Sequence, residues 1–153
     1  MTGSQFNILL VEDEPNDVFL IDRAFRKCNF QQPLQVVNDG EQALAYLGGT
    51  KEYADRHKYP VPSLLLLDLK LPRRSGLEVL AWLRNREDSL KRLPVVVLTS
   101  SKQSSDVNRA YELGANSYLV KPVAFDGLLE LIKALNSYWA RFNERPDLSP
   151  SGI

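Results

Sequence analysis

Residues 64–68 read Leu-Leu-Leu-Leu-Asp, an unbroken apolar run that ends on a carboxylate. Such a run is typical of a strand buried on both faces, as in a parallel sheet. Residues 8–11, 34–37, 95–98 and 118–120 have the same strand-like character. The sequence therefore predicts five short strands, and Asp68 marks the end of the third.

The stretches between these runs carry apolar residues at helical spacing. We predict helices over about 15–28, around 43–47, 77–83 and 107–113, and over 125–142. Strands that alternate with helices predict an α/β fold with a doubly wound, five-stranded parallel sheet. The length of 153 residues suits one domain. We assign residues 1–142 to it and residues 143–153 to a short C-terminal tail, with no output domain.

Charge and composition exclude several classes of protein. The chain has 19 Lys plus Arg and 19 Asp plus Glu, so it lacks the net positive charge typical of nucleic-acid-binding proteins. No apolar run approaches the roughly 20 residues of a membrane span, and the first residues lack the basic segment of a signal peptide. Cys28 is the single cysteine, which excludes an internal disulfide. We expect a cytoplasmic protein that binds neither nucleic acid nor membrane.

Polar residues with a shared chemistry follow four of the predicted strands. Glu12 and Asp13 follow the first, Asp68 the third, Thr99 closes the fourth, and Lys121 follows the fifth. Ligands of an open parallel sheet bind beyond the carboxyl ends of its strands, so these side chains are expected to share one site. Any one of them could instead cap a helix or be solvated, but Asp68 lies too far before the next helix to cap it.

The residue types indicate phosphoryl chemistry. Carboxylates are the ligands that Mg²⁺ prefers, together with water and phosphate oxygens. A carboxylate can also attack phosphorus and form an aspartyl phosphate. An ammonium group and a hydroxyl can then stabilise charge on the phosphoryl oxygens. Each member of the group thus has a chemical role.

The sequence resembles the receiver domains of two-component response regulators over nearly its whole length. The resemblance lies in Glu12-Asp13, Leu67-Asp68, Leu71-Pro72 with Ser75-Gly76, Thr99-Ser100, and Tyr118-Leu119-Val120-Lys121-Pro122. It implies the flavodoxin-like (βα)5 fold with strand order 2-1-3-4-5. The long connection at 48–62 and the extended last helix look more like the small single-domain regulators associated with phytochromes.

The resemblance also implies a role for each site residue. Asp68 would accept phosphate from a sensor histidine kinase, for which a phytochrome is a candidate. Mg²⁺ would bind to Glu12, Asp13, Asp68 and the main-chain carbonyl of Lys70. Lys121 would pair with the phosphate and precede a cis peptide bond to Pro122. Thr99 and Tyr118 would form the switch pair that passes the signal to a downstream protein, by contact or by onward phosphotransfer.

Two other classes of protein compete with this interpretation. An aspartate-nucleophile phosphatase or phosphotransferase needs a second acid two residues after the nucleophile, where this chain has Lys70. A nucleotide- or flavin-binding module would carry a glycine-rich phosphate loop, and neither common loop motif follows the first strand. We therefore expect a signalling protein that is not an enzyme in the usual sense, although it catalyses its own phosphorylation and dephosphorylation at Asp68.

The last predicted helix carries more apolar surface than one sheet can cover. Its stripe is wider than the roughly 100° needed for packing on a sheet. Its end, with Tyr138, Trp139 and Phe142, is expected to be exposed in a monomer and to form a homodimer interface. Tyr53 and Tyr59 are expected to pin the long connection to the body of the domain.

Overall fold

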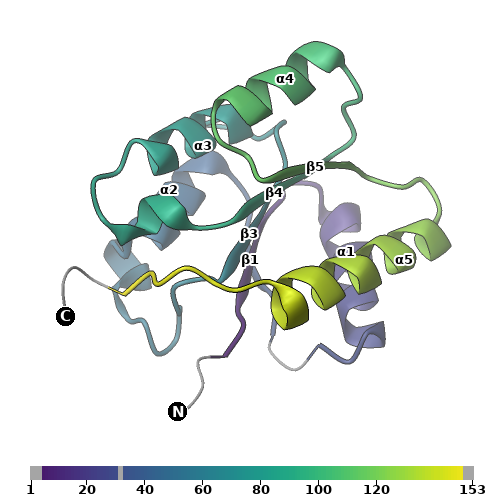
Figure 1. The fold of residues 1–153 in the computed structure, drawn as a ribbon, viewed down its shortest axis with the longest axis horizontal. Helices are drawn as coiled ribbons and strands as arrows, with labels where there is room; N and C mark the ends of the chain where they lie inside the picture. Colours follow the sequence, from purple (N-terminus) through teal and green to yellow (C-terminus); the bar gives the residue numbers. More distant parts are fainter. Residues whose placement is uncertain (1–4, 31–32, 150–153) are drawn as a thin grey trace.

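The computed structural model describes residues 5–30 and 33–149, and its strands form one parallel sheet. The order is β2-β1-β3-β4-β5, as the resemblance implied (Figure 1). The predicted runs become the five strands, with small shifts at their ends: β1 (Ile8–Val11), β2 (Gln35–Val37), β3 (Leu64–Leu67), β4 (Val95–Thr99) and β5 (Ser117–Val120).

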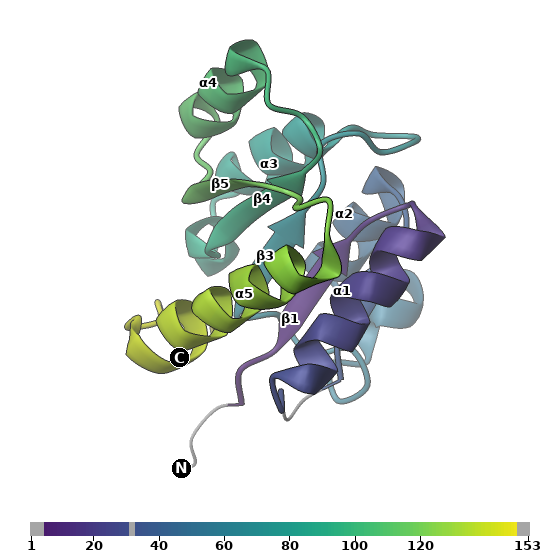
Figure 2. The ribbon, with the colours of Figure 1, turned by 90° about the vertical axis from the view of Figure 1, so that its right-hand side faces the viewer.

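Helices cover both faces of the sheet. They are α1 (Pro15–Lys27), α2 (Gly40–Gly48), α3 (Gly76–Arg84), α4 (Ser104–Glu112) and α5 (Phe125–Leu135), with short 3₁₀-helices η1 (Lys51–Ala54) and η2 (Ser89–Arg92). Helices α1 and α5 lie together on one face, and α2, α3 and α4 lie on the other (Figures 1 and 2). Alternate side chains of a strand point to opposite faces, so β3 contributes Leu64 and Leu66 to one core and Leu65 and Leu67 to the other. Both faces of β3 are buried, so every position of the run is apolar.

The last helix differs from its prediction. Helix α5 ends at Leu135, and residues 136–142 continue as a π-helix, η3 (Asn136–Phe142). The amide of Asn143 donates to the carbonyl of Tyr138 at 2.7 Å, the five-residue spacing of that helix type. The changed turn places Trp139 against the core between α1, α5 and the sheet, half-buried. Its expected exposure is therefore wrong, whereas Tyr138 and Phe142 are 55% and 68% exposed.

The amino ends of the strands are covered by the segment that follows η3. The Arg145 guanidinium donates to the carbonyl of Gln5 at 3.2 Å, and Arg92 donates to the carbonyl of Asp147 at 2.6 Å. Leu148 packs against the core on the α2–α3–α4 side. The expected tail 143–153 thus packs back onto the domain as far as residue 149, and residues 150–153 lie outside the described part of the chain.

The long connection before β3 is pinned by aromatic contacts, as predicted. The rings of Tyr53 and Tyr59 lie 5.0 Å and 5.9 Å from the ring of Tyr46 in α2, measured between centroids. The Tyr46 hydroxyl donates to the carbonyl of Pro60 at 2.9 Å.

Among residues 5–30 and 33–149, no helix combines the length and apolar character needed to cross a membrane.

Candidate functional site: the acidic cluster at the carboxyl edge

The carboxyl ends of β1, β3, β4 and β5 bring the predicted site residues together. Glu12, Asp68 and Thr99 are buried, with 1%, 6% and 0% of their surface exposed, and Asp13 is exposed. Carboxylate oxygens of Glu12, Asp13 and Asp68 lie within 4.8 Å of one another. Carboxylates at this spacing repel one another unless a cation or a proton compensates them. The site is therefore built to hold positive charge.

The turn after β3 fixes the Asp68 carboxylate. Its Oδ1 accepts the amide N–H of Leu69 at 2.7 Å, and its own amide donates to Val11 at 3.1 Å. Helix α3 then begins against this turn, because the amide of Gly76 donates to the carbonyl of Leu69 at 2.9 Å. A Cβ at Gly76 would lie 2.1 Å from the Asp68 carbonyl oxygen, so the close approach requires glycine.

The ammonium group of Lys121 lies between three carboxylates. Its Nζ is 2.6 Å from Glu12 Oε1, 2.8 Å from Asp17 Oδ2 and 3.2 Å from Asp68 Oδ2. Burial by itself would lower the pKa of Lys121, but the contacts with Asp17 and Glu12, and the charge of Asp68, raise this pKa above its usual value. Lys121 is therefore fully charged and supplies the compensating cation of the site.

Glu12 is the buried carboxylate of the cluster whose hydrogen bonds within the described part of the chain are incomplete. Its Oε2 accepts the amide of Glu14 at 3.1 Å, whereas Oε1 is buried and makes no hydrogen bond of good geometry within the described residues. The contact of Oε1 with Lys121 is thus a close ion pair and not a well-directed hydrogen bond. Burial raises the pKa of Glu12 to about 7, against the lowering effect of Lys121. A buried carboxylate oxygen with no directed donor, next to Asp13 and Asp68, fits a divalent cation such as Mg²⁺.

Thr99 ends β4 at the same edge of the sheet, and its hydroxyl is buried without a hydrogen-bond partner among the described residues. An unsatisfied buried hydroxyl costs about 1–3 kcal/mol, so its presence indicates a ligand that the hydroxyl is meant to meet. Tyr118, the other member of the expected switch pair, is half-buried and donates its hydroxyl to the carbonyl of Ser101 at 3.0 Å. Burial raises the pKa of Tyr118, so its phenol stays protonated and able to donate.

The structure corrects one expectation for this site and adds one residue to it. No cis peptide bond occurs among the described residues, so the bond between Lys121 and Pro122 is trans. The trans isomer is favoured before proline by about 0.5–1 kcal/mol, and Lys121 leaves β5 with its amide still bonded to Thr99 at 2.8 Å.

Asp17 was not predicted to belong to the site. As an acid in the first turn of a helix it looks like a favourable dipole partner, and only the tertiary contact with Lys121 reveals it.

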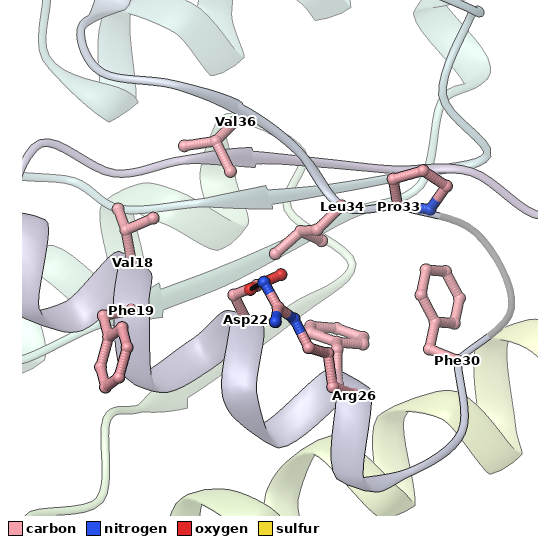
Figure 3. Close-up of a pocket in the computed structure, with 9 residues that line it drawn as sticks. Val18, Phe19, Asp22, Arg26, Phe30, Pro33, Leu34 and Val36 are labelled. Atoms are coloured by element: carbon pink, nitrogen blue, oxygen red, sulfur yellow. Dashed lines mark ion pairs between the residues drawn. The ribbon is translucent and has the colours of Figure 1, made fainter.

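A separate groove lies between α1 and β2 and shares no residue with the acidic cluster (Figure 3). Apolar side chains of α1, of β2 and of Phe30, Pro33 and Leu34 form most of its wall, and Asp22 and Arg26 pair with each other in it at 2.6 Å. The groove thus contains one satisfied ion pair. The chemistry-bearing residues gather at the carboxyl edge instead.

Comparisons with known proteins agree with the fold and the cluster. Residues 8–133 match the family model of the response regulator receiver domain. The probable methanogenesis regulatory protein FilR2 of Methanothrix harundinacea is 39% identical over 92% of this chain and 88% of its own length. The response regulator Rcp1 of Synechocystis is 40% identical over 86% of this chain and 87% of its own.

Solved structures of similar proteins have the same fold. The phosphorylated cyanobacterial phytochrome response regulator RcpA superposes with a TM-score of 0.83 at 37% identity, over 94% of this chain and all of its own. Rcp1 has been solved in a Mn²⁺-bound form, with a TM-score of 0.82 over 93% of this chain and 99% of its own. The chain therefore belongs to the response regulator receiver family. It is a response regulator homologous to those associated with phytochromes.

Proposed function

We propose that this response regulator accepts a phosphoryl group on Asp68 from a sensor histidine kinase, in a reaction that needs Mg²⁺. One observation carries the proposal: Glu12 Oε1 and Thr99 Oγ1 are buried at the same edge of the sheet as Asp68, without hydrogen-bond partners among the described residues. While Asp68 is unmodified, both oxygens lack a hydrogen-bond partner among the described residues. A metal on the carboxylates and a phosphoryl group on Asp68 would satisfy both.

The chemistry follows from the positions of the side chains. The Asp68 carboxylate attacks phosphorus, the new O–P bond forms, and the N–P bond to the kinase histidine breaks with its electron pair returning to the imidazole. Lys121, already 3.2 Å from Asp68 Oδ2, pairs with a phosphoryl oxygen. Thr99 donates its hydroxyl to another oxygen. Bound Mg²⁺ supplies further neutralisation of the phosphoryl charge, and Glu12, Asp13, Asp68 and the Lys70 carbonyl would hold it.

We infer that the modified state is read out through Thr99 and Tyr118. If the Thr99 hydroxyl moves toward the phosphoryl group, the space beside it changes and Tyr118 can release the Ser101 carbonyl. The surface formed by α4, β5 and α5 is thereby reshaped for a downstream protein. The chain then acts as a signalling protein whose own chemistry is limited to phosphorylation and dephosphorylation at Asp68.

The phosphorylation proposal is tested with acetyl phosphate and Mg²⁺, with intact-mass measurement of the adduct. We expect one labile phosphate on the wild type and none on Asp68→Asn. Asp88→Asn, an exposed acid that pairs with Arg86 far from the cluster, serves as the control and should react like the wild type. Phosphate uptake by Asp68→Asn at the native rate, or uptake unchanged by excess chelator, would contradict the proposal.

The kinase partner follows from the homology, and phytochrome kinases are the first candidates because RcpA is a phytochrome response regulator. Phosphotransfer profiling against the histidine kinases of the same genome tests this assignment. We expect one kinase, of the phytochrome type, to transfer phosphate to Asp68 much faster than the others. Equal transfer from all kinases, or preference for another type, would contradict it.

We also propose a homodimer that uses the exposed rings of Tyr138 and Phe142. Both project from η3, next to the switch surface formed by β5 and α5. Since couplings of about 1–3 kcal/mol are typical, phosphorylation should tighten the dimer by roughly five- to 150-fold. Sedimentation equilibrium of the wild type and of Tyr138→Ser/Phe142→Glu, with and without beryllofluoride, tests this. A wild type that stays monomeric at high micromolar concentration in both states would refute it.

A further inference from the structure

The contact between Asp17 and Lys121 is not explained by the reaction at Asp68. Lys121 has three N–H donors and lies against three carboxylates, from Glu12, Asp17 and Asp68. Two of these acids belong to the cluster that can hold a metal ion, and Asp17 does not. It comes from the first turn of α1, whose start is set by the Glu14 cap and by Pro15.

Two cations, the Lys121 ammonium and a divalent metal ion, can bind to the same carboxylate oxygens of the cluster. The oxygen of Glu12 that touches Lys121 is its only oxygen without a directed donor, and the Asp68 oxygen that touches Lys121 is the one not bonded to Leu69. A divalent ion needs the same outward-facing oxygens. Lys121 and the metal therefore compete for Glu12 and Asp68, and whatever draws Lys121 away from them favours the metal.

We propose that Asp17 is a positioning residue that shares the Lys121 ammonium with Glu12 and Asp68 and weakens its hold on them, so that Mg²⁺ can displace it from their oxygens. This inference rests on the proposed Mg²⁺-dependent phosphorylation of Asp68. Asp17 accepts the shorter of the two directed hydrogen bonds of Lys121, 2.8 Å against 3.2 Å to Asp68.

This role and simple charge both predict weaker Mg²⁺ binding without Asp17, but only this role requires Lys121. Without the Asp17 carboxylate, Lys121 turns fully to Glu12 and Asp68, and Mg²⁺ must displace it. We expect Asp17→Asn to weaken Mg²⁺ binding about fivefold, less than the value of one charge-assisted hydrogen bond because Asp17 is partly exposed. Asp17→Glu keeps the carboxylate and should recover most of the affinity.

The test is calorimetric titration of the full chain with Mg²⁺ alone, in a double-mutant cycle of Asp17→Asn and Lys121→Met. In the Lys121→Met background there is no ammonium to hold, so Asp17→Asn should leave the affinity unchanged within about twofold. The matched control is Asp22→Asn, which removes the same charge from α1 at the same 32% side-chain exposure but pairs with Arg26. It should bind Mg²⁺ like the wild type.

A second readout needs no metal. Urea unfolding of the same four proteins in chelator measures the coupling between Asp17 and Lys121, which should be clearly non-additive. It also shows whether each variant is folded.

Three results would overturn the inference. An equal loss of Mg²⁺ affinity in the Lys121→Met background would show that Asp17 acts only through its charge. Unchanged binding by Asp17→Asn, with the wild type binding normally, would remove this role and leave the proposed function intact. A wild type that binds no Mg²⁺ at millimolar concentration would overturn the role and the proposed function together.

Discussion

The two ends of the sheet use buried cations in opposite ways. At the carboxyl edge, Lys121 faces three carboxylates while buried oxygens of Glu12 and Thr99 find no directed partner within the described residues. At the amino edge, Arg84 donates to the carbonyls of Gly114, Lys91 and Leu93 and to the side chain of Asn116, at 2.8–3.1 Å. At the amino edge, Arg84 satisfies the carbonyls that it meets, whereas at the carboxyl edge the buried oxygens of Glu12 and Thr99 are left free to meet a ligand.

The difference separates stability from function within one sheet. Satisfied polar networks rigidify a fold, whereas unsatisfied buried groups at a site are maintained at the expense of stability. Substitutions at the amino edge should therefore change the free energy of unfolding without changing phosphorylation. Substitutions at the carboxyl edge should change phosphorylation, and some of them should make the protein more stable.

The largest expected effect is that of Lys121→Met in metal-free protein. Treated as a lysine in a solvated turn, Lys121 is expected to change the unfolding free energy by no more than about 0.5 kcal/mol. The structure buries it, with 11% of its side chain exposed, among three acids. Removing it leaves their charges uncompensated and should cost about 3 kcal/mol in urea unfolding, a loss that Mg²⁺ partly restores. A loss under 0.5 kcal/mol would show a surface-like lysine.

At the opposite edge, Arg84→Met should cost about 2 kcal/mol, because several carbonyls lose a charged donor. Burial lowers the pKa of Arg84, and its hydrogen-bond partners within the described part of the chain are all neutral, so Mg²⁺ should not rescue this variant. Phosphate uptake from acetyl phosphate should match that of the wild type. Uptake reduced as strongly as in Lys121→Met would break the proposed separation between the two edges.

Two substitutions that each remove one hydroxyl should change the unfolding free energy in opposite directions. Thr99→Val removes a buried hydroxyl that lacks a partner, and it should raise the unfolding free energy by about 1 kcal/mol while impairing the response to beryllofluoride. Ser63→Ala removes a hydroxyl whose oxygen accepts the amide of Asn7 at 3.2 Å, and it should lower the unfolding free energy by about 1 kcal/mol. Destabilisation by Thr99→Val would mean that its hydroxyl is satisfied in solution.

The smallest expected effect on stability comes from ionisation of the Tyr46 phenol, and it appears only at high pH. Burial raises the pKa of Tyr46 to about 12, partly opposed by Arg56. The unfolded chain loses this proton near its usual pKa of 10, so the contribution of Tyr46 to stability is complete below pH 10 and is lost as the pH rises to about 12. Tyrosinate absorbance of the wild type should show one late-titrating phenol that is missing in Tyr46→Phe. An early titration of all phenols would show that the Tyr46 hydroxyl is open to solvent.

The sheet, its helices and the residue types at the site follow from the sequence alone. Continuous apolar runs such as 64–67 are typical of buried strands, and the carboxyl ends of parallel strands meet at one edge, so Glu12, Asp68, Thr99 and Lys121 were predictable together. These features are local, because each depends on the spacing of residues within a single element.

Only the tertiary structure decided what the site residues touch. Asp17 and Lys121 are 104 positions apart, and no periodicity links them. The burial of Lys121, the trans bond before Pro122 and the inward position of Trp139 likewise depend on how loops and helix ends pack together. A sequence pattern reports the face that an element buries, whereas the partner of a charged side chain is chosen by packing between distant elements, where small differences in distance and solvent exposure decide the electrostatic energy.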